Sequence, residues 1–320
     1  FNDLIEIRQK SSAMSSARRA SWKITVAGVD CTDAINEDLL SMSLTDNEED
    51  EADDLQIKLH DKSGKWLQWW LNDTVQQGAK TKGLEFEIWI GVLEDDGKIS
   101  QQKAGKFELD SVKHSGPPSV VTIKCTSLSY AGGIRDNERS KSWENYTLKG
   151  IAEEIAGKAG MSVSFYAGTN QTYSREEQSD ETDIAFLKRL CQDSGIALKC
   201  TNGKLILFNK DAYTSKESVK TIIFGDGTYT KWDFSTGTGD VDFDSCEVSY
   251  TDPHTGITIE GMAYADDYDE EAEEHTTLMV RGVKVNSQGE ATALAEQRLK
   301  LRNQFERTAT FTLPGTPTLM

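Results

Sequence analysis

Apolar and polar residues alternate along much of the first 130 residues. Trp22, Ile24 and Val26 are separated by polar residues, and this period of two is typical of a β-strand with one buried face. The spacing predicts an antiparallel β-barrel or sandwich over residues 21–130, after an N-terminal extension, residues 1–20. Further strand segments are residues 40–44, 55–59, 86–90, 107–112 and 121–125.

The hydrophobic period changes to about 3.6 residues after Gly133. Leu148, Ile151 and Ile155 lie at helical spacing, and Gly160 is placed to end that helix. A second helix is predicted around residues 184–194, with Thr182 or Asp183 as the N-cap and Gly195 as the C-cap.

Short apolar segments accompany these helices. The segment 163–166 is predicted to be a strand, and a polar loop is expected between it and the second helix. Segments 196–200 and 205–208 flank Asn202-Gly203, a strong hairpin signal. Together these elements predict a small α/β module over residues 131–212.

Strand patterning returns in the last third of the chain and predicts a second β domain over residues 213–320. An acidic loop is expected at 265–275 and a long helix at 288–306, and the domain is expected to be incomplete at its C-terminus. The predicted strands are residues 221–224, 229–234, 241–250, 256–264, 278–285 and 308–313.

The charge balance is strongly acidic. The chain has 53 Asp and Glu against 35 Lys and Arg, which gives a net charge of −18. Such a chain would repel nucleic-acid phosphates rather than wrap them. No segment approaches the roughly 18 consecutive apolar residues of a membrane helix. The five cysteines are scattered without a CxxC pair, so reduced, buried thiols are expected.

No secretory signal is visible at Phe1, and the first residue is not Met. Synthesis in a cytoplasm is therefore the default, and we expect the chain to be a fragment trimmed at both ends. Enzyme signatures are also missing from the sequence. A phosphate loop, a HExxH pair, a GxSxG elbow and a calcium loop each lack required residues. The sequence thus predicts no catalytic residue, no cofactor and no metal.

Trp66, Trp69 and Trp70 would lie on one face of a helical turn. They could cover the core of the first β domain, form a protein-contact patch or offer a sugar platform, and the core is favoured. We take all three as interface candidates. Lys188 and Arg189 on the second helix are further candidates, expected to be exposed beside its apolar stripe.

The order of these pieces, together with several local segments, resembles the late control gene D family of contractile-tail phages, whose members form the tail baseplate hub. The resemblance covers nearly the whole chain and is weaker after Asp240. The segments that carry it are residues 40–47, 51–59, 105–114, 118–124, Ser142-Trp143, Thr147-Leu148 and 183–190 with Gly195.

The resemblance implies a mainly β fold with two tail-tube-like antiparallel β-barrels, the small α/β module between them and the long helix on the second barrel. It implies a non-enzymatic, structural protein that forms a homotrimeric ring in the tail baseplate of a phage, a tailocin or another contractile injection system. The implied partners are further copies of the chain, the tail tube protein or a tube initiator ring, the central spike protein and baseplate wedge proteins. DNA would be only a passing cargo, if the particle is a phage. Synthesis and assembly would take place in the bacterial host cytoplasm.

Two alternatives stay open at the level of sequence. A tail-associated cell-wall hydrolase would need an acid pair or a zinc cluster in the α/β module. A carbohydrate-binding tail protein would use the tryptophans as its platform.

Overall fold

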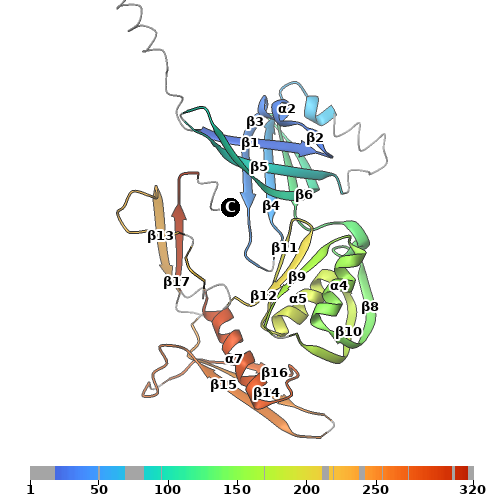
Figure 1. Cartoon of the computed structure of the whole chain (residues 1–320), viewed down its shortest axis with the longest axis vertical. Coiled ribbons are helices and arrows are strands. Elements are labelled where there is room, and N and C mark those ends of the chain that lie inside the picture. Colours follow the sequence, from blue (N-terminus) through green and yellow to red (C-terminus); the bar gives the residue numbers. More distant parts are fainter. Residues whose placement is uncertain are drawn as a thin grey trace, which may run out of the picture.

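The computed structural model describes residues 19–315, except for 50, 69–82, 95, 169, 211–215, 219, 238–241, 254, 273 and 305–306. The described residues form a mainly β fold, as predicted. The first sheet lies at one end of the long axis and helix α7 with strands β14 to β16 at the other, as Figure 1 shows. Among the described residues, no helix is both long enough and apolar enough to cross a membrane.

The first sheet is antiparallel and seven-stranded, with the order β2-β1-β5-β6-β7-β4-β3. Its alternating apolar residues form one buried cluster, with Ile24, Ile57 and Phe86 almost fully buried. A short helix, α2 (Thr32–Asn36), follows β2. The strands are β1 (Arg19–Val26), β2 (Val29–Asp30), β3 (Leu39–Thr45), β4 (Asp54–His60), β5 (Glu85–Leu93), β6 (Ile99–Ser115) and β7 (Val120–Thr126).

The predicted strands of this sheet are confirmed, but a closed barrel is not observed. In the described part of the chain, β2 and β3 are the two ends of the strand order, and no pairing joins them. The closure of this sheet into a barrel therefore stays a prediction.

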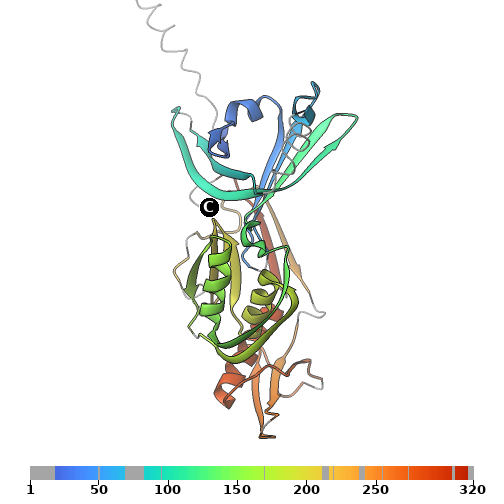
Figure 2. The same ribbon diagram turned by 90° about the vertical axis from the view of Figure 1, so that its right-hand side faces the viewer.

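The module consists of two helices between two small sheets (Figures 1 and 2). Helices α4 and α5 contact strands on both sides and share one hydrophobic cluster with them. The elements are η1 (Ala131–Gly133), β8 (Glu138–Thr147), α4 (Leu148–Lys158), β9 (Ser162–Tyr166), β10 (Thr172–Thr182), α5 (Asp183–Asp193), β11 (Ala197–Thr201) and β12 (Lys204–Phe208).

Both predicted helices and the hairpin are confirmed. The Thr182 hydroxyl accepts a hydrogen bond from the Ala185 amide and so caps α5. Asn202 and Gly203 both have positive φ, as the hairpin turn requires. The prediction of a polar loop before α5 is wrong, because β10 occupies this segment and pairs with β8.

The last third contains two separate sheets. Strands β13 (Lys231–Thr236) and β17 (Arg307–Thr312) form an antiparallel ribbon. Strands β15 (Thr258–Tyr264), β14 (Ser245–Thr251) and β16 (Thr277–Arg281) form the second sheet, on which α7 (Gln288–Asn303) packs. Gly261 permits this packing, because a Cβ atom there would lie 2.3 Å from the Thr292 amide nitrogen.

The predicted strand at 221–224 is wrong. The Asp226 side chain accepts hydrogen bonds from the Ile223 and Thr228 amides, and Gly225 and Gly227 both have positive φ. This local turn competes with an extended conformation. The acidic segment after β15 is an exposed loop where it is described, as expected.

Candidate interaction surfaces

The ligand sets that hold metal ions in proteins consist mostly of clustered His, Cys, Asp and Glu side chains. No group of three or more His, Cys, Asp or Glu side chains within them could hold a metal ion. Burial raises the pKa of Cys200 to about 12 and that of Cys246 to about 11. These thiols stay protonated at neutral pH and are poor nucleophiles.

Trp66 belongs to the rim of the first core. It is half-buried against the apolar cluster of the first sheet, and its indole Nε1 donates a hydrogen bond of 2.8 Å to Asp38. The buried Asp61 carboxylate accepts from the Trp66 and Leu67 amides and caps this helical turn. The role of Trp66 as an interface residue stays a prediction. Trp69 and Trp70 lie outside the described residues.

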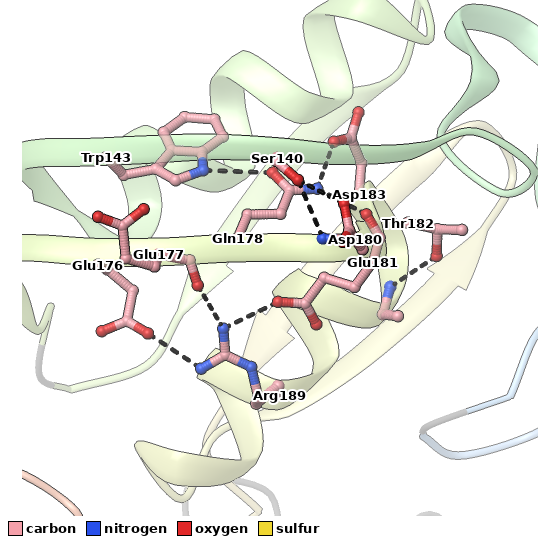
Figure 3. A network of polar contacts seen from close by, with 11 residues as sticks. Ser140, Trp143, Glu176, Glu177, Gln178, Asp180, Glu181, Thr182, Asp183 and Arg189 are labelled. Atoms are coloured by element: carbon pink, nitrogen blue, oxygen red, sulfur yellow. Dashed lines mark hydrogen bonds and ion pairs between the residues drawn. The ribbon is translucent and has the colours of Figure 1, made fainter.

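Arg189 and Lys188 are both half-buried, which corrects the expectation that they are exposed. The Arg189 guanidinium forms ion pairs of 2.9 Å with Glu176 and Glu181, and it donates to the Glu177 carbonyl oxygen (Figure 3). Since both carboxylates belong to β10, Arg189 ties α5 to that strand. Its use at an interface would require these contacts to be shared or broken.

A buried polar network lies next to Arg189 (Figure 3). The Gln178 side chain accepts from the Trp143 indole at 3.3 Å and donates to the Asp183 carboxylate at 2.9 Å. All three side chains are almost fully buried, and the second Asp183 oxygen lies 3.5 Å from Arg139 Nε. The network fixes the start of α5 against β8 and β10. A single Gln within a charged segment carries no sequence signal for such a role.

Hydrogen bonds and ion pairs connect the module to the first sheet. The Ser127 hydroxyl accepts from the Asp53 amide and donates to the Cys200 carbonyl oxygen at 2.6 Å. Lys199 on β11 forms ion pairs with Asp46 and Asp53. These contacts hold the end of β11 against the loop between β3 and β4.

The module also contacts α7. Arg298 forms an ion pair of 2.9 Å with Asp193. Gly195, with φ +64°, lies so close to Gln297 that a Cβ atom there would be 1.8 Å from the Gln297 Oε1. Lys210 pairs with Glu49 and donates to the Gln304 side chain at 2.6 Å. The module is thus the piece that joins both β regions.

The β13–β17 ribbon has an exposed aromatic face. Trp232 and Phe234 are 45% and 58% exposed, and their rings contact each other and the rings of Phe224 and Phe311. The opposite face carries polar residues, such as Asp233 opposite Thr310. Large exposed aromatic patches are typical of interaction surfaces. The sequence did not point to this patch, because alternation alone does not say whether a second sheet covers the apolar face.

Comparison with known proteins gives two related sequences. The chain is 33% identical to the probable baseplate hub protein of Escherichia phage P2 over 180 residues, which are 55% of this chain and 42% of that protein. It is 27% identical to the probable baseplate hub protein of Escherichia phage 186 over 187 residues, 58% of this chain and 44% of that protein. The chain thus spans less than half the length of either curated relative. No protein-family model matches it.

The fold is also found in a solved structure. The tail protein from Neisseria meningitidis MC58 superposes with a TM-score of 0.62 at 13% identity, covering 92% of this chain and 81% of that chain. At this identity the similarity concerns the fold alone. The two sequence matches go beyond the fold, and they confirm the resemblance to baseplate hub proteins of phages that the sequence indicated.

Proposed function

We propose that the chain is a structural protein of the baseplate hub, located in the tail baseplate of a virion or of a phage-tail-like particle. It forms a homotrimeric ring that joins the hexameric tail tube to the trimeric central spike. The observation that carries this proposal is the 33% identity to the P2 hub protein over 180 residues. Tube, spike and wedge proteins are the proposed partners, and DNA is a passing cargo in a phage.

The exposed strands of the chain support an assembly of this kind. In the described part of the chain the β13–β17 ribbon has two strands, and an isolated two-stranded ribbon is marginally stable in water. Its aromatic face and its free edges would be covered in a ring of several copies. The short β2 strand at the end of the first sheet offers another edge.

Two tube-like barrels in each subunit are part of this proposal. Three copies with two similar β domains each would present six similar surfaces to a hexameric tube. Closure of each barrel would then involve strands from a neighbouring copy or from residues outside the described ones.

We also propose that the chain has no catalytic activity of its own. The exposed aromatic face formed by Trp232 and Phe234 is the one observation that favours the carbohydrate-binding alternative. In that case sugars would quench the tryptophan fluorescence of the purified chain. Cell-wall hydrolysis would appear as release of soluble fragments from purified cell wall.

The test is native mass spectrometry of the full-length protein at low micromolar concentration, alone and with its co-expressed spike neighbour. A trimer that takes up one trimeric spike is the expected result. A protein that stays monomeric in both samples would overturn the proposal.

A further inference from the structure

A cavity rich in arginine lies between the module, β16 and the C-terminal half of α7. It has a volume of about 580 Å³ and is lined by Arg281, Arg298 and Arg302. Its apolar wall includes Leu278 and Leu301. Among the lining residues that the structure describes, the one carboxylate belongs to Glu49, which is already paired with Lys210. The cavity is therefore positively charged within a strongly acidic chain.

Two of these arginines lack the carboxylate partners that most other described arginines have. Arg298 is paired with Asp193, but Arg281 and Arg302 are exposed and form no ion pair with a carboxylate of the described residues. By contrast, six arginines are ion-paired, namely Arg135, Arg139, Arg175, Arg189, Arg298 and Arg307. A guanidinium binds carboxylates in a planar, two-point geometry, so this pair of side chains is suited to an acidic peptide.

An acidic peptide of this kind lies on the other side of α7. The loop between β15 and β16, called here the acidic loop (residues 266–272 and 274), exposes six carboxylates, those of Asp266, Asp267, Asp269, Glu270, Glu271 and Glu274. Within it, the Tyr268 ring contacts Tyr264 and stacks on His275, with ring centroids 4.5 and 4.9 Å apart. These ring contacts tie Tyr268 to residues on both sides of the loop, and a restraint of this kind lowers the entropy cost of docking.

The acidic loop and the arginine cavity line mostly different sides of α7. Asp266 and Asp267 share a second cavity with Glu296, whereas Arg298 and Arg302 line the first. With about 100° between successive helical residues, Glu296 and Arg298 point to roughly opposite sides of α7. Gln304, just after the end of α7, lines both cavities, and the module residues Gln192 and Ile196 line only the arginine cavity.

We propose that the acidic loop of one copy docks into the arginine cavity of the next copy. Because the two surfaces differ, the contact can repeat head-to-tail, and this repetition closes a ring when the rotation permits. The partner is a second copy of this chain. This inference rests on the proposed ring and names the contact that holds neighbouring copies together.

Charge reversal on each side tests the contact. One variant carries Arg281→Glu and Arg302→Glu, a second carries Asp269→Lys and Glu270→Lys, and a third combines all four changes in one chain. All four side chains are exposed, so each variant should fold, which circular dichroism checks. A control with Lys62→Glu and Lys113→Glu changes the net charge by the same amount as the arginine variant, at exposed positions elsewhere.

In native mass spectrometry and sedimentation, each one-sided variant should assemble at least tenfold more weakly than the wild type. The combined variant should regain most of the lost affinity, and the lysine control should behave as the wild type does. An equal mixture of the two one-sided variants should form 1:1 pairs but no stable trimer, because a three-membered ring always leaves one contact between like charges.

The outcomes separate this inference from the proposed function. A wild-type trimer whose stability is unchanged in both one-sided variants would overturn the loop contact and leave the hub proposal intact. A combined variant no better than either one-sided variant would also overturn it. A wild type that stays monomeric with and without the spike would overturn both.

Discussion

At the scale of single residues, Gly195 and Gly160 have the same left-handed backbone but different surroundings. Their φ angles are +64° and +65°, and each follows a helix of the module. A Cβ atom at Gly195 would meet the Gln297 side chain, whereas at Gly160 no atom lies within 4 Å. Gly160→Ala should therefore lower the free energy of unfolding only by the strain of a left-handed backbone, about 1–2 kcal/mol. Gly195→Ala should lower the free energy of unfolding further, because the Gln297 side chain must also move.

Thermal unfolding of the two variants checks this prediction. Gly195→Ala should have the lower Tm, and the additional change Gln297→Ala should recover part of the difference, because it removes the Oε1 atom nearest to the new methyl group. Equal Tm values for Gly195→Ala and Gly160→Ala would show that the module is not packed against α7 as described.

Glu154 on α4 should contribute a pH-dependent part of the stability. Burial alone would raise its pKa, but hydrogen bonds from Lys141, Lys158 and Tyr146 lower the pKa from 4.5 to about 2. Since the folded pKa lies below the unfolded one, the stabilisation is complete above about pH 4.5 and is lost as the pH falls towards 2. The Tm difference between the wild type and Glu154→Gln should therefore shrink from pH 6 to pH 2.5. A constant difference would contradict this assignment.

At the scale of elements, sequence patterning located most strands because they bury one face. Strand β4, with Leu55, Ile57 and Leu59 buried, alternates almost perfectly. Sequence patterning did not locate strand β10, because much of this strand is charged and exposed and only Gln178 is fully buried. Its conformation is set by pairing with β8, which is a non-local contact.

The candidate surfaces were less predictable than the elements. Arg281 and Arg302 are 21 positions apart in the sequence, yet both line one cavity. They do so because β16 pairs in parallel with β14 and α7 packs back on that sheet. Likewise, the exposure of Trp232 depends on whether anything covers the ribbon. Local periodicity contains neither piece of information.

The β13–β17 ribbon should exchange its amide hydrogens rapidly in the isolated subunit. Its residues are exposed, apart from the half-buried Phe311, and it pairs with no other strand of the described chain. In the proposed ring, coverage of the aromatic face should slow this exchange at least tenfold. Hydrogen–deuterium exchange on dilute and concentrated samples measures it, with buried strand β4 as the control. Equal exchange of the ribbon in both samples would contradict its place at the interface.

At the scale of the whole molecule, the net charge of −18 opposes assembly while the loop and the arginine cavity favour it. The two effects respond differently to salt because they act over different distances. The Debye length falls from about 30 Å at 0.01 M salt to about 8 Å at 0.15 M, which removes most repulsion between distant charges of neighbouring copies. It reaches about 3 Å only near 1 M, where ion pairs in a partly desolvated contact are also weakened.

The affinity between wild-type copies should therefore rise from 0.01 to 0.15 M NaCl and fall again towards 1 M. In the variant with Arg281→Glu and Arg302→Glu the attractive contact is lost, so its weaker affinity should rise with salt and then stay level or continue to rise. Analytical ultracentrifugation at three salt concentrations distinguishes the two curves. If the curves are parallel, the short-range attraction lies elsewhere on the subunit, and the acidic charge acts only as a uniform repulsion that assembly must overcome.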